Sequence, residues 1–135
     1  MIYIDANIFI LAITNTDNLG EKARKFLRNL QKEKAATSTL TFDEIVWKVL
    51  KIKGYDAAMV VANNLIKMPS LTWLDVDISI LSKSADLMKS YKIFPRDSIH
   101  AACALNNNIF TIISEDKDFD EVDELKRTSI SELRF

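Results

Sequence analysis

Short apolar runs of strand length alternate along the chain with longer stretches whose apolar residues recur every three to four positions. Three apolar runs stand out, at residues 2–9, 71–76 and 109–113, and a run of small residues lies at 35–38. Strand-like runs that alternate with helical periodicity predict a parallel sheet with right-handed crossovers and helices on both faces. The expected fold is therefore a three-layer α/β/α sandwich around a mainly parallel sheet of four to five strands.

Apolar periodicity also predicts where most of the helices lie. A short helix is expected over residues 9–13, and an amphipathic helix carries Ala23, Phe26, Leu27 and Leu30 after a polar break at 14–20. Two further helices follow, and they are expected to end near Gly54 and before Pro69, because proline cannot continue a helix.

The second half of the chain continues this alternation. Asp77 is a candidate N-cap for a helix whose apolar residues are Leu81, Ala85 and Met88. A helix rich in alanine follows Pro95 and is expected to stop at the asparagines 106–108, since asparagine tolerates a left-handed cap. The mixed tail, residues 121–135, is expected to hold at most a weak edge strand.

Composition narrows the class of protein. A chain of 135 residues suffices for one hydrophobic core, so we expect a single domain over residues 1–135. Only two glycines and two prolines argue against an all-β fold rich in tight turns, and a single cysteine, Cys103, excludes an internal disulfide. No apolar run approaches the length of a membrane helix, so a soluble cytoplasmic protein without membrane contact is expected. The net charge of −1 gives no overall nucleic-acid signature.

Four acidic residues fall at the boundaries of the predicted elements. Asp5 closes the apolar start of the first run, Glu44 sits in an early helical turn, Asp97 opens the alanine-rich helix, and Asp116 follows the run at 109–113. In a parallel sheet, the ends of strands and the starts of the next helices lie at one edge, so these carboxylates are expected to converge. Their repulsion is relieved either by raised pKa values or by a bound cation.

Carboxylates and water are ligands typical of Mg²⁺ or Mn²⁺, whereas zinc favours histidine and cysteine, and the chain has one of each. Such ions can orient a phosphodiester and activate water, which is nuclease chemistry. His100 is the only histidine, so cleavage of RNA by a histidine pair is disfavoured.

Each acid except Asp5 also has a plain structural interpretation that the sequence leaves open. Glu44 stands three residues after Thr41, as in a capping box, and four before Lys48, as in a helical ion pair. Asp97 can simply cap its helix, and Asp116 can start a turn. Asp43, next to Glu44, would take its place if the helix were shifted by one residue.

Together, the motifs resemble those of a known family. They are Asp-x-Asn after the first strand, a mid-chain glutamate on a helix, the segment RDSIHAA at 96–102, and ISEDKDF at 113–119. The pattern covers nearly the whole chain and resembles a PIN domain, with the small size of the VapC-type toxin ribonucleases of toxin–antitoxin pairs.

This resemblance implies a Mg²⁺- or Mn²⁺-dependent endoribonuclease that leaves a 5′-phosphate and a 3′-hydroxyl, forms a homodimer and is silenced by a cognate antitoxin. It implies that the metal ligands are Asp5, Glu44, Asp97 and Asp116. It also implies that Asn7 and Ser114 support the site by hydrogen bonds and that Asp118 is an outer acid. Ala6 departs from the family, in which a hydroxyl residue is frequent there, and on an extended strand its side chain would point away from the acids.

Other residues receive less specific expectations. RNA contacts are expected from cations near the acids in sequence, which are Lys48, Lys51, Lys53, Arg96 and Lys117. His100 is expected to be a packed or edge histidine rather than a ligand, and Cys103 a buried small hydrophobe. Trp47 and Trp73 are expected in the core or in a subunit contact.

Two other classes of protein remain open at this point. A phosphoryl-transfer domain, either a haloacid-dehalogenase-like phosphatase or a receiver, also places an aspartate after a parallel strand. The phosphatase requires a second aspartate where Asn7 stands, and the receiver requires a lysine after a late strand, where the chain has acids at 114–116. A PIN fold used only for binding or scaffolding is the third possibility.

Overall fold

The computed structural model describes residues 1–31 and 34–133. In these two ranges, one sheet contains five strands, all parallel, in the order β3-β2-β1-β4-β5. The strands are β1 (Ile2–Ile4), β2 (Ala35–Ser38), β3 (Leu71–Leu74), β4 (Thr111–Ile113) and β5 (Lys126–Thr128). The predicted parallel sheet is confirmed, and the tail does hold an edge strand, β5. Positions 134–135 of the predicted tail and domain lie outside the described residues.

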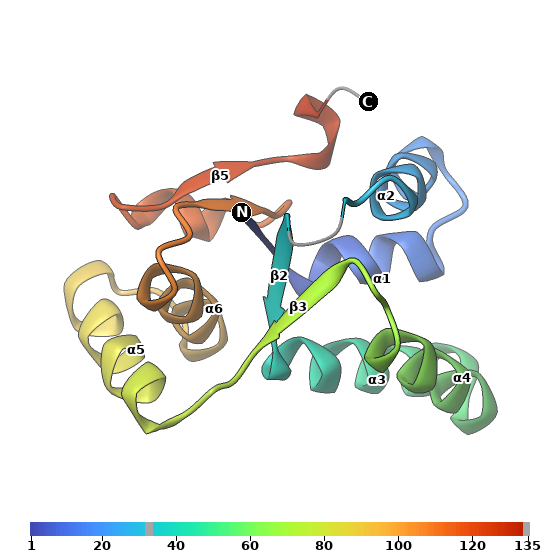
Figure 1. Ribbon diagram of the computed structural model, residues 1–135, viewed down its shortest axis with the longest axis horizontal. Coiled ribbons are helices and arrows are strands. Elements are labelled where there is room, and N and C mark those ends of the chain that lie inside the picture. Colours follow the sequence, from blue (N-terminus) through green and yellow to red (C-terminus); the bar gives the residue numbers. More distant parts are fainter. Residues whose placement is uncertain (32–33, 134–135) are drawn as a thin grey trace.

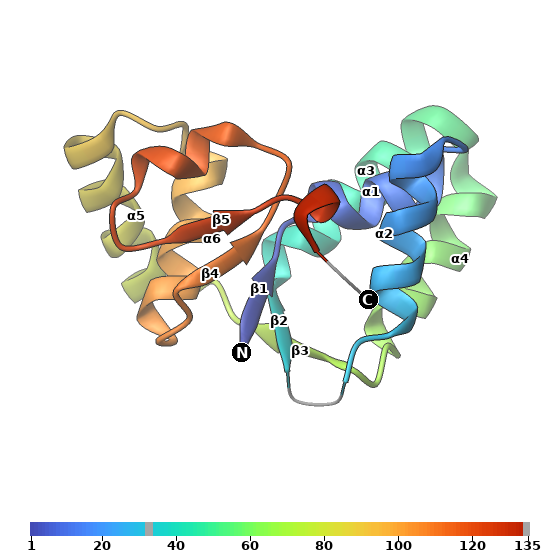
Figure 2. The ribbon, with the colours of Figure 1, turned by 90° about the horizontal axis from the view of Figure 1, so that it is seen from above.

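Within the described residues, six helices cover the two faces of the sheet. They are α1 (Ala6–Thr14), α2 (Asn18–Arg28), α3 (Thr39–Lys53), α4 (Tyr55–Ile66), α5 (Ile78–Tyr91) and α6 (Pro95–Asn106). α5 and α6 lie on one side of the sheet, and the other four helices lie on the opposite side (Figures 1 and 2). Two short 3₁₀ helices, η1 (Lys117–Glu121) and η2 (Ile130–Glu132), flank β5. This arrangement confirms the predicted three-layer α/β/α architecture.

Alternating side chains of the central strands build two separate cores. Tyr3 and Ile112 belong to the core under α5 and α6, whereas Ile4 and Ile113 belong to the core under the four other helices. This alternation is the expected consequence of the two-residue period of a strand. Residues 101–104 of α6 are fully buried, and their small side chains let this helix pack closely on the sheet.

The first strand is shorter than predicted. β1 ends at Ile4, Asp5 is the extended N-cap residue of α1, and the amide of Ile8 already donates to the carbonyl of Asp5. The apolar residues after Asn7 therefore face the core from a helix. Their spacing alone did not show where the strand ends and this helix begins. Ala6 accordingly lies buried at the start of α1 and not on an extended strand.

The predicted helix after Asp77 exists, but its buried face was predicted incorrectly. Asp77 caps α5 by accepting a hydrogen bond from the amide of Ile80, as expected. Leu81 and Ala85 are exposed, and the helix turns Ser84 inward, where its hydroxyl lies 2.5 Å from that of Ser98 on α6. α5 buries Ile80, Ser84 and Leu87, so its buried face is displaced by one residue from the predicted stripe of Leu81, Ala85 and Met88.

Helix ends agree better with the sequence. Gly54, at φ 90°, separates α3 from α4, and Asn108, at φ 57°, follows the end of α6. The predicted break at 14–20 is shorter, because Asp17 caps α2 through the amide of Gly20. In the described part of the chain, no helix combines the length and apolar character needed to cross a bilayer.

Candidate metal centre

The four acids predicted from the sequence lie at the same edge of the sheet. Asp5 follows β1, and Asp116 follows the neighbouring strand β4. Glu44 projects from α3, the helix after β2, and Asp97 lies in the first turn of α6. The parallel topology brings them together, because each position follows a strand end or lies near a helix start. They form two groups, which we call the inner and the outer cluster.

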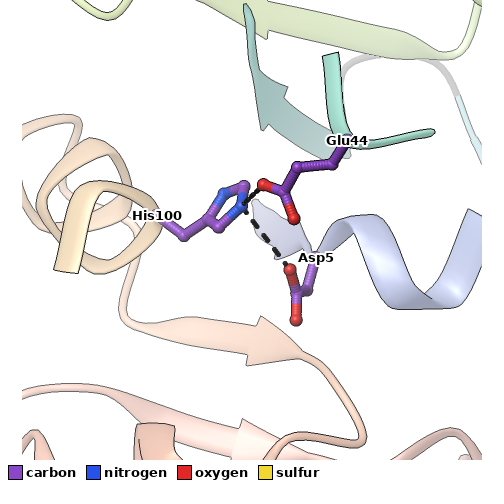
Figure 3. Close-up of side chains that lie close together, drawn as sticks. All are labelled: Asp5, Glu44 and His100. Carbon is purple, nitrogen blue, oxygen red and sulfur yellow. Dashed lines mark hydrogen bonds and ion pairs between the residues drawn. The ribbon is translucent and has the colours of Figure 1, made fainter. Parts of the chain in front are cut away.

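The inner cluster consists of Asp5, Glu44 and His100, with one ligand atom from each lying within 4.8 Å of the others. The Nε2 atom of His100 lies 2.5 Å from Oε1 of Glu44 and 3.7 Å from Oδ1 of Asp5. Figure 3 shows the imidazole pointing between the two carboxylates. Asp5 and His100 are 6% and 1% exposed, whereas Glu44 is only partly buried, so the inner cluster meets solvent on the side of Glu44.

Burial and charge act against each other in the inner cluster. Burial raises the pKa of Asp5, while His100 and the hydroxyl of Ser114 favour its ionised form and oppose that rise. For His100, burial favours the neutral ring, but the hydrogen bond to Glu44 and the charges of Asp5, Glu44 and Asp97 outweigh it and raise the pKa. The imidazole is therefore the group that compensates this pair of carboxylates.

The outer cluster consists of Asp97, Asp116 and Asp118, again with ligand atoms within 4.8 Å. Partial burial, followed by the charges of Asp116, Asp5 and Asp118, raises the pKa of Asp97 to about 7. Within residues 1–31 and 34–133, no lysine or arginine forms an ion pair with these three acids. Uncompensated carboxylates this close together favour a bound cation.

Ser114 connects the two clusters. Its hydroxyl donates to Oδ2 of Asp5 at 2.6 Å and accepts from the backbone amide of Asp116 at 3.0 Å and from the side-chain amide of Asn7 at 3.2 Å. The Asp116 carboxylate in turn accepts from the amide of Asp118 at 2.9 Å. Of the polar residues predicted to support the site, Ser114 thus contacts Asp5 and Asp116 directly, and Asn7 contacts Ser114.

The structure distinguishes Glu44 from Asp43 and from a capping role. Asp43 is exposed, whereas Glu44 faces His100. Thr41 lies inside α3, and its hydroxyl bonds with that of Thr37 at 2.6 Å, so the capping box with Glu44 does not form. Asp97 is not the N-cap of α6, because Phe94 occupies that position, but Asp116 does cap η1.

The contacts of two residues of this region were not predicted from the sequence. His100, predicted to be a packed or edge histidine, is packed among acids, and Tyr3 lies directly behind it with its hydroxyl 2.6 Å from Nδ1. The position of His100, three residues after Asp97 on one helix, was the available signal. Nothing local marks Tyr3, which is 97 residues away from its partner.

The predicted cations lie outside both clusters. Lys48, Lys51, Lys53, Arg96 and Lys117 are all exposed. Lys51 places its ammonium 5.8 Å from the ring centroid of Trp47. Trp47 is 58% exposed, which contradicts a place in the core. Cys103 is buried, as predicted.

Trp73 is partly buried. It lines an apolar cavity of about 340 Å³ together with Phe42 and Ile66.

The donor set fits a hard divalent cation. Five carboxylates and one imidazole gather at this edge, and the outer cluster offers oxygen ligands only. Oxygen ligands of this kind suit Mg²⁺ and Mn²⁺, and a cation would relieve the repulsion from Asp116, Asp5 and Asp118 that helps to raise the pKa of Asp97.

Solved structures of low sequence identity share this fold. FitAcB from Neisseria gonorrhoeae is 21% identical, with a TM-score of 0.80 over 98% of this chain and 100% of the matched chain. VapC20 from Mycobacterium tuberculosis, a sarcin-ricin loop cleaving toxin, is 15% identical, with a TM-score of 0.78 over 93% and 99%. DNA-bound VapBC from Salmonella typhimurium is 17% identical, with a TM-score of 0.77 over 96% and 97%.

A comparison with curated protein sequences gives no match. The family model of the PIN domain, by contrast, matches residues 2–125, which is most of the chain and includes all six residues of the two clusters. The match therefore favours the PIN domain over the phosphatase and receiver families that the sequence had left open. The chain belongs to the PIN domain family.

Proposed function

We propose that this protein is a metal-dependent endoribonuclease, and that Asp5, Glu44, Asp97 and Asp116 hold the ion. The observation that carries the proposal is the pairing of two acidic clusters at one sheet edge, joined by Ser114. Mg²⁺ or Mn²⁺ is the proposed cofactor, because the donors are mainly carboxylate oxygens. Asp118 is assigned to the outer side of the site, where it lies exposed.

When bound, a divalent cation lowers the pKa of the attacking water and stabilises charge on the leaving oxygen. The protein's own contribution is orientation. Ser114 holds one oxygen of Asp5 at 2.6 Å, and Asn7 donates to Ser114, so the carboxylate that follows β1 has a fixed direction. Hydrolysis in this way leaves a 5′-phosphate and a 3′-hydroxyl, which is the outcome that we propose for this chain.

RNA is the proposed substrate. The described cations near the acids, Lys48, Lys51, Arg96 and Lys117, are exposed and available to phosphates, and we assign phosphate contacts to them. The likeness to VapC20, a toxin that cleaves the sarcin-ricin loop, supports RNA as the substrate class.

We also propose that the chain is the toxin of a toxin–antitoxin pair, acts in the cytoplasm and forms a homodimer. The similar fold in a toxin–antitoxin complex from Klebsiella pneumoniae and in DNA-bound VapBC supports an antitoxin partner. If this is correct, induction of the chain alone arrests growth, and co-expression of a small protein encoded next to it restores growth. Light scattering of the purified protein tests the homodimer.

The decisive test replaces Asp97 with Asn in the full chain. We expect Mn²⁺-dependent cleavage of an RNA panel to fall by about a hundredfold or more, because one charged ligand becomes neutral. Asp86→Asn, on the exposed side of α5, is the matched control and should cleave like the original protein. Cleavage at the original rate in Asp97→Asn contradicts the proposed site.

The result separates an enzyme from a binding module. A protein that binds no Mn²⁺ in a calorimetric titration and cleaves no RNA would be a PIN fold used only for scaffolding. Cleavage that survives a chelator would instead exclude a role for the metal.

A further inference from the structure

A buried aromatic pair lies behind the inner cluster and is not part of the proposed ligand set. The hydroxyl of Tyr3 lies 2.6 Å from Nδ1 of His100, and the two rings meet edge to face with centroids 5.7 Å apart. Tyr3 is 0% exposed and His100 is 1% exposed. Two polar groups buried so deeply are costly unless each makes its hydrogen bonds, so their contact fixes both rings.

The contacts of the imidazole determine where its proton lies. Burial raises the pKa of Tyr3 well above its ordinary value, so its hydroxyl is protonated and can donate to Nδ1. A neutral ring that accepts at Nδ1 carries its proton on Nε2, and a charged ring carries protons on both nitrogens. In both cases Nε2–H faces the carboxylates of Glu44, at 2.5 Å, and Asp5, at 3.7 Å.

We propose that His100, held by Tyr3, is a positioning residue that fixes the Glu44 carboxylate for metal binding. The proposal rests on the proposed function, because Glu44 matters in this way only if the site holds a cation. Asp5 already has Ser114 as its donor. Glu44 has a longer side chain with more rotatable bonds, and His100 supplies the corresponding donor for it.

The backbone beneath Glu44 is fixed as well. Thr37, at the end of β2, donates to the carbonyl of Ile4 at 2.8 Å and bonds with Thr41 in the first turns of α3 at 2.6 Å. This connection ties the start of α3 to β1. With its backbone fixed by the threonines and Oε1 held by His100, Glu44 can turn Oε2 toward a cation, since no hydrogen bond to Oε2 occurs among the described residues.

If His100 were itself a metal ligand, its proton would have to lie on the other ring nitrogen. To bind a metal through Nε2, the ring must lose that proton and keep one on Nδ1, so Tyr3 would have to accept instead of donate. The positioning role and the ligand role are therefore distinguishable by the nitrogen that carries the proton and by whether nitrogen contacts the ion.

The experiment measures Mn²⁺ affinity by calorimetry on the full chain without RNA. We expect His100→Ala to weaken binding by about tenfold or more, as is typical when the hydrogen-bond partner of a metal ligand is lost. His100→Gln keeps an N–H donor close to the Nε2 position and should bind within about threefold of the original protein. Tyr3→Phe should fall between these two.

Ser98→Ala is the matched control, because it removes a buried hydrogen bond from α6 without touching the inner cluster. Urea unfolding of each variant identifies losses that come only from stability. Equal affinity in His100→Ala and Ser98→Ala overturns the proposal, and so does a nitrogen coupling to bound Mn²⁺ in pulsed electron paramagnetic resonance. If His100→Ala fails to fold, His100→Gln and Tyr3→Phe still give the decisive ranking.

A readout without metal separates this inference from the proposed function. In ¹⁵N nuclear magnetic resonance spectra of the metal-free protein, we expect a proton on Nε2 of His100, protected from exchange, and its loss of protection in Tyr3→Phe. An unprotonated Nε2 overturns the positioning role even if RNA is cleaved. A protonated Nε2 in a protein that binds no metal instead contradicts the proposed function.

Discussion

The inner and outer clusters contain the same kind of acid in opposite environments. Asp5 and Glu44 lie beside an imidazole, and Asp5 also accepts a short bond from Ser114. In the outer cluster, the charged groups that most affect Asp97 are other carboxylates, and its pKa is raised to about 7. The fold thus compensates one half of the centre with its own donors and leaves the other half uncompensated.

This difference suggests that the two clusters contribute to metal binding in different ways. Ligands that are oriented before the ion arrives reduce the entropy lost on binding, which is the contribution of the inner cluster. Carboxylates that repel one another gain most when a cation arrives, which is the contribution of the outer cluster. The predictions below test the two halves separately, from the largest expected effect to the smallest.

Replacing Glu44 with Gln should have the largest effect. The amide keeps the shape of the side chain but removes the charge that His100 and a cation both require, so RNA cleavage should fall by about a hundredfold or more. Asp43→Asn, one residue earlier and exposed, is the matched control. Steady-state cleavage of one RNA compares the two, and a larger loss in Asp43→Asn would reverse their assignment.

Most of the fold and the four acids could be predicted from the sequence because each is a local signal. A strand-length run, a helix start or a stop residue is visible within a few positions, and the parallel topology then places Asp5 and Asp116 just after two neighbouring strands. The sequence could not give the strand end at Ile4, because the apolar residues of β1 continue without a break into those of α1.

The contacts of His100 could not be predicted in this way, because its partners are distant in the sequence. His100 meets Glu44 across 56 positions and Tyr3 across 97, and no local periodicity records such a pairing. The buried face of α5 was predicted incorrectly for a related reason. Ile80 and Leu87 are buried together with Ser84, and this serine, whose partner Ser98 lies on another helix, interrupts the apolar pattern of the buried face.

Replacing Ser114 with Ala breaks the connection between the two clusters. Asp5 loses a donor at 2.6 Å, and the backbone amide of Asp116 loses its acceptor at 3.0 Å. We expect Mn²⁺ affinity to fall by about tenfold, with a loss of unfolding free energy of about 1–3 kcal/mol. Calorimetry and urea unfolding measure the two effects. Ser131→Ala, whose hydroxyl bonds that of Ser129 and no acid of either cluster, should leave Mn²⁺ affinity unchanged.

The outer cluster should make the metal-free protein less stable as the pH rises. The pKa of Asp97 is about 7 in the folded protein and near 3.8 when unfolded, so the folded state binds more protons between these values. The free energy of unfolding therefore falls from about pH 4 to pH 7, by on the order of 1 kcal/mol for this partly exposed group.

Thermal unfolding across this pH range measures the decline. Asp97→Asn should flatten it, Asp86→Asn should keep it, and added Mn²⁺ should reverse it at neutral pH. A stability that rises with pH in the metal-free protein would contradict an uncompensated outer cluster.

The smallest effect should come from cations that belong to neither cluster. Lys48 and Lys51 follow Glu44 by four and seven residues, so all three lie along one side of α3. Charge reversal at both lysines should raise the KM for RNA by about threefold at low salt and less at high salt, because phosphate contacts are screened. Mn²⁺ affinity should stay the same, since neither lysine contacts an acid of the centre. Reversal of both Lys67, at the end of α4, and Lys89, on α5, changes the net charge equally and is the control. An unchanged KM would remove α3 from the RNA surface and leave Arg96 and Lys117, on the outer side, as the remaining phosphate contacts.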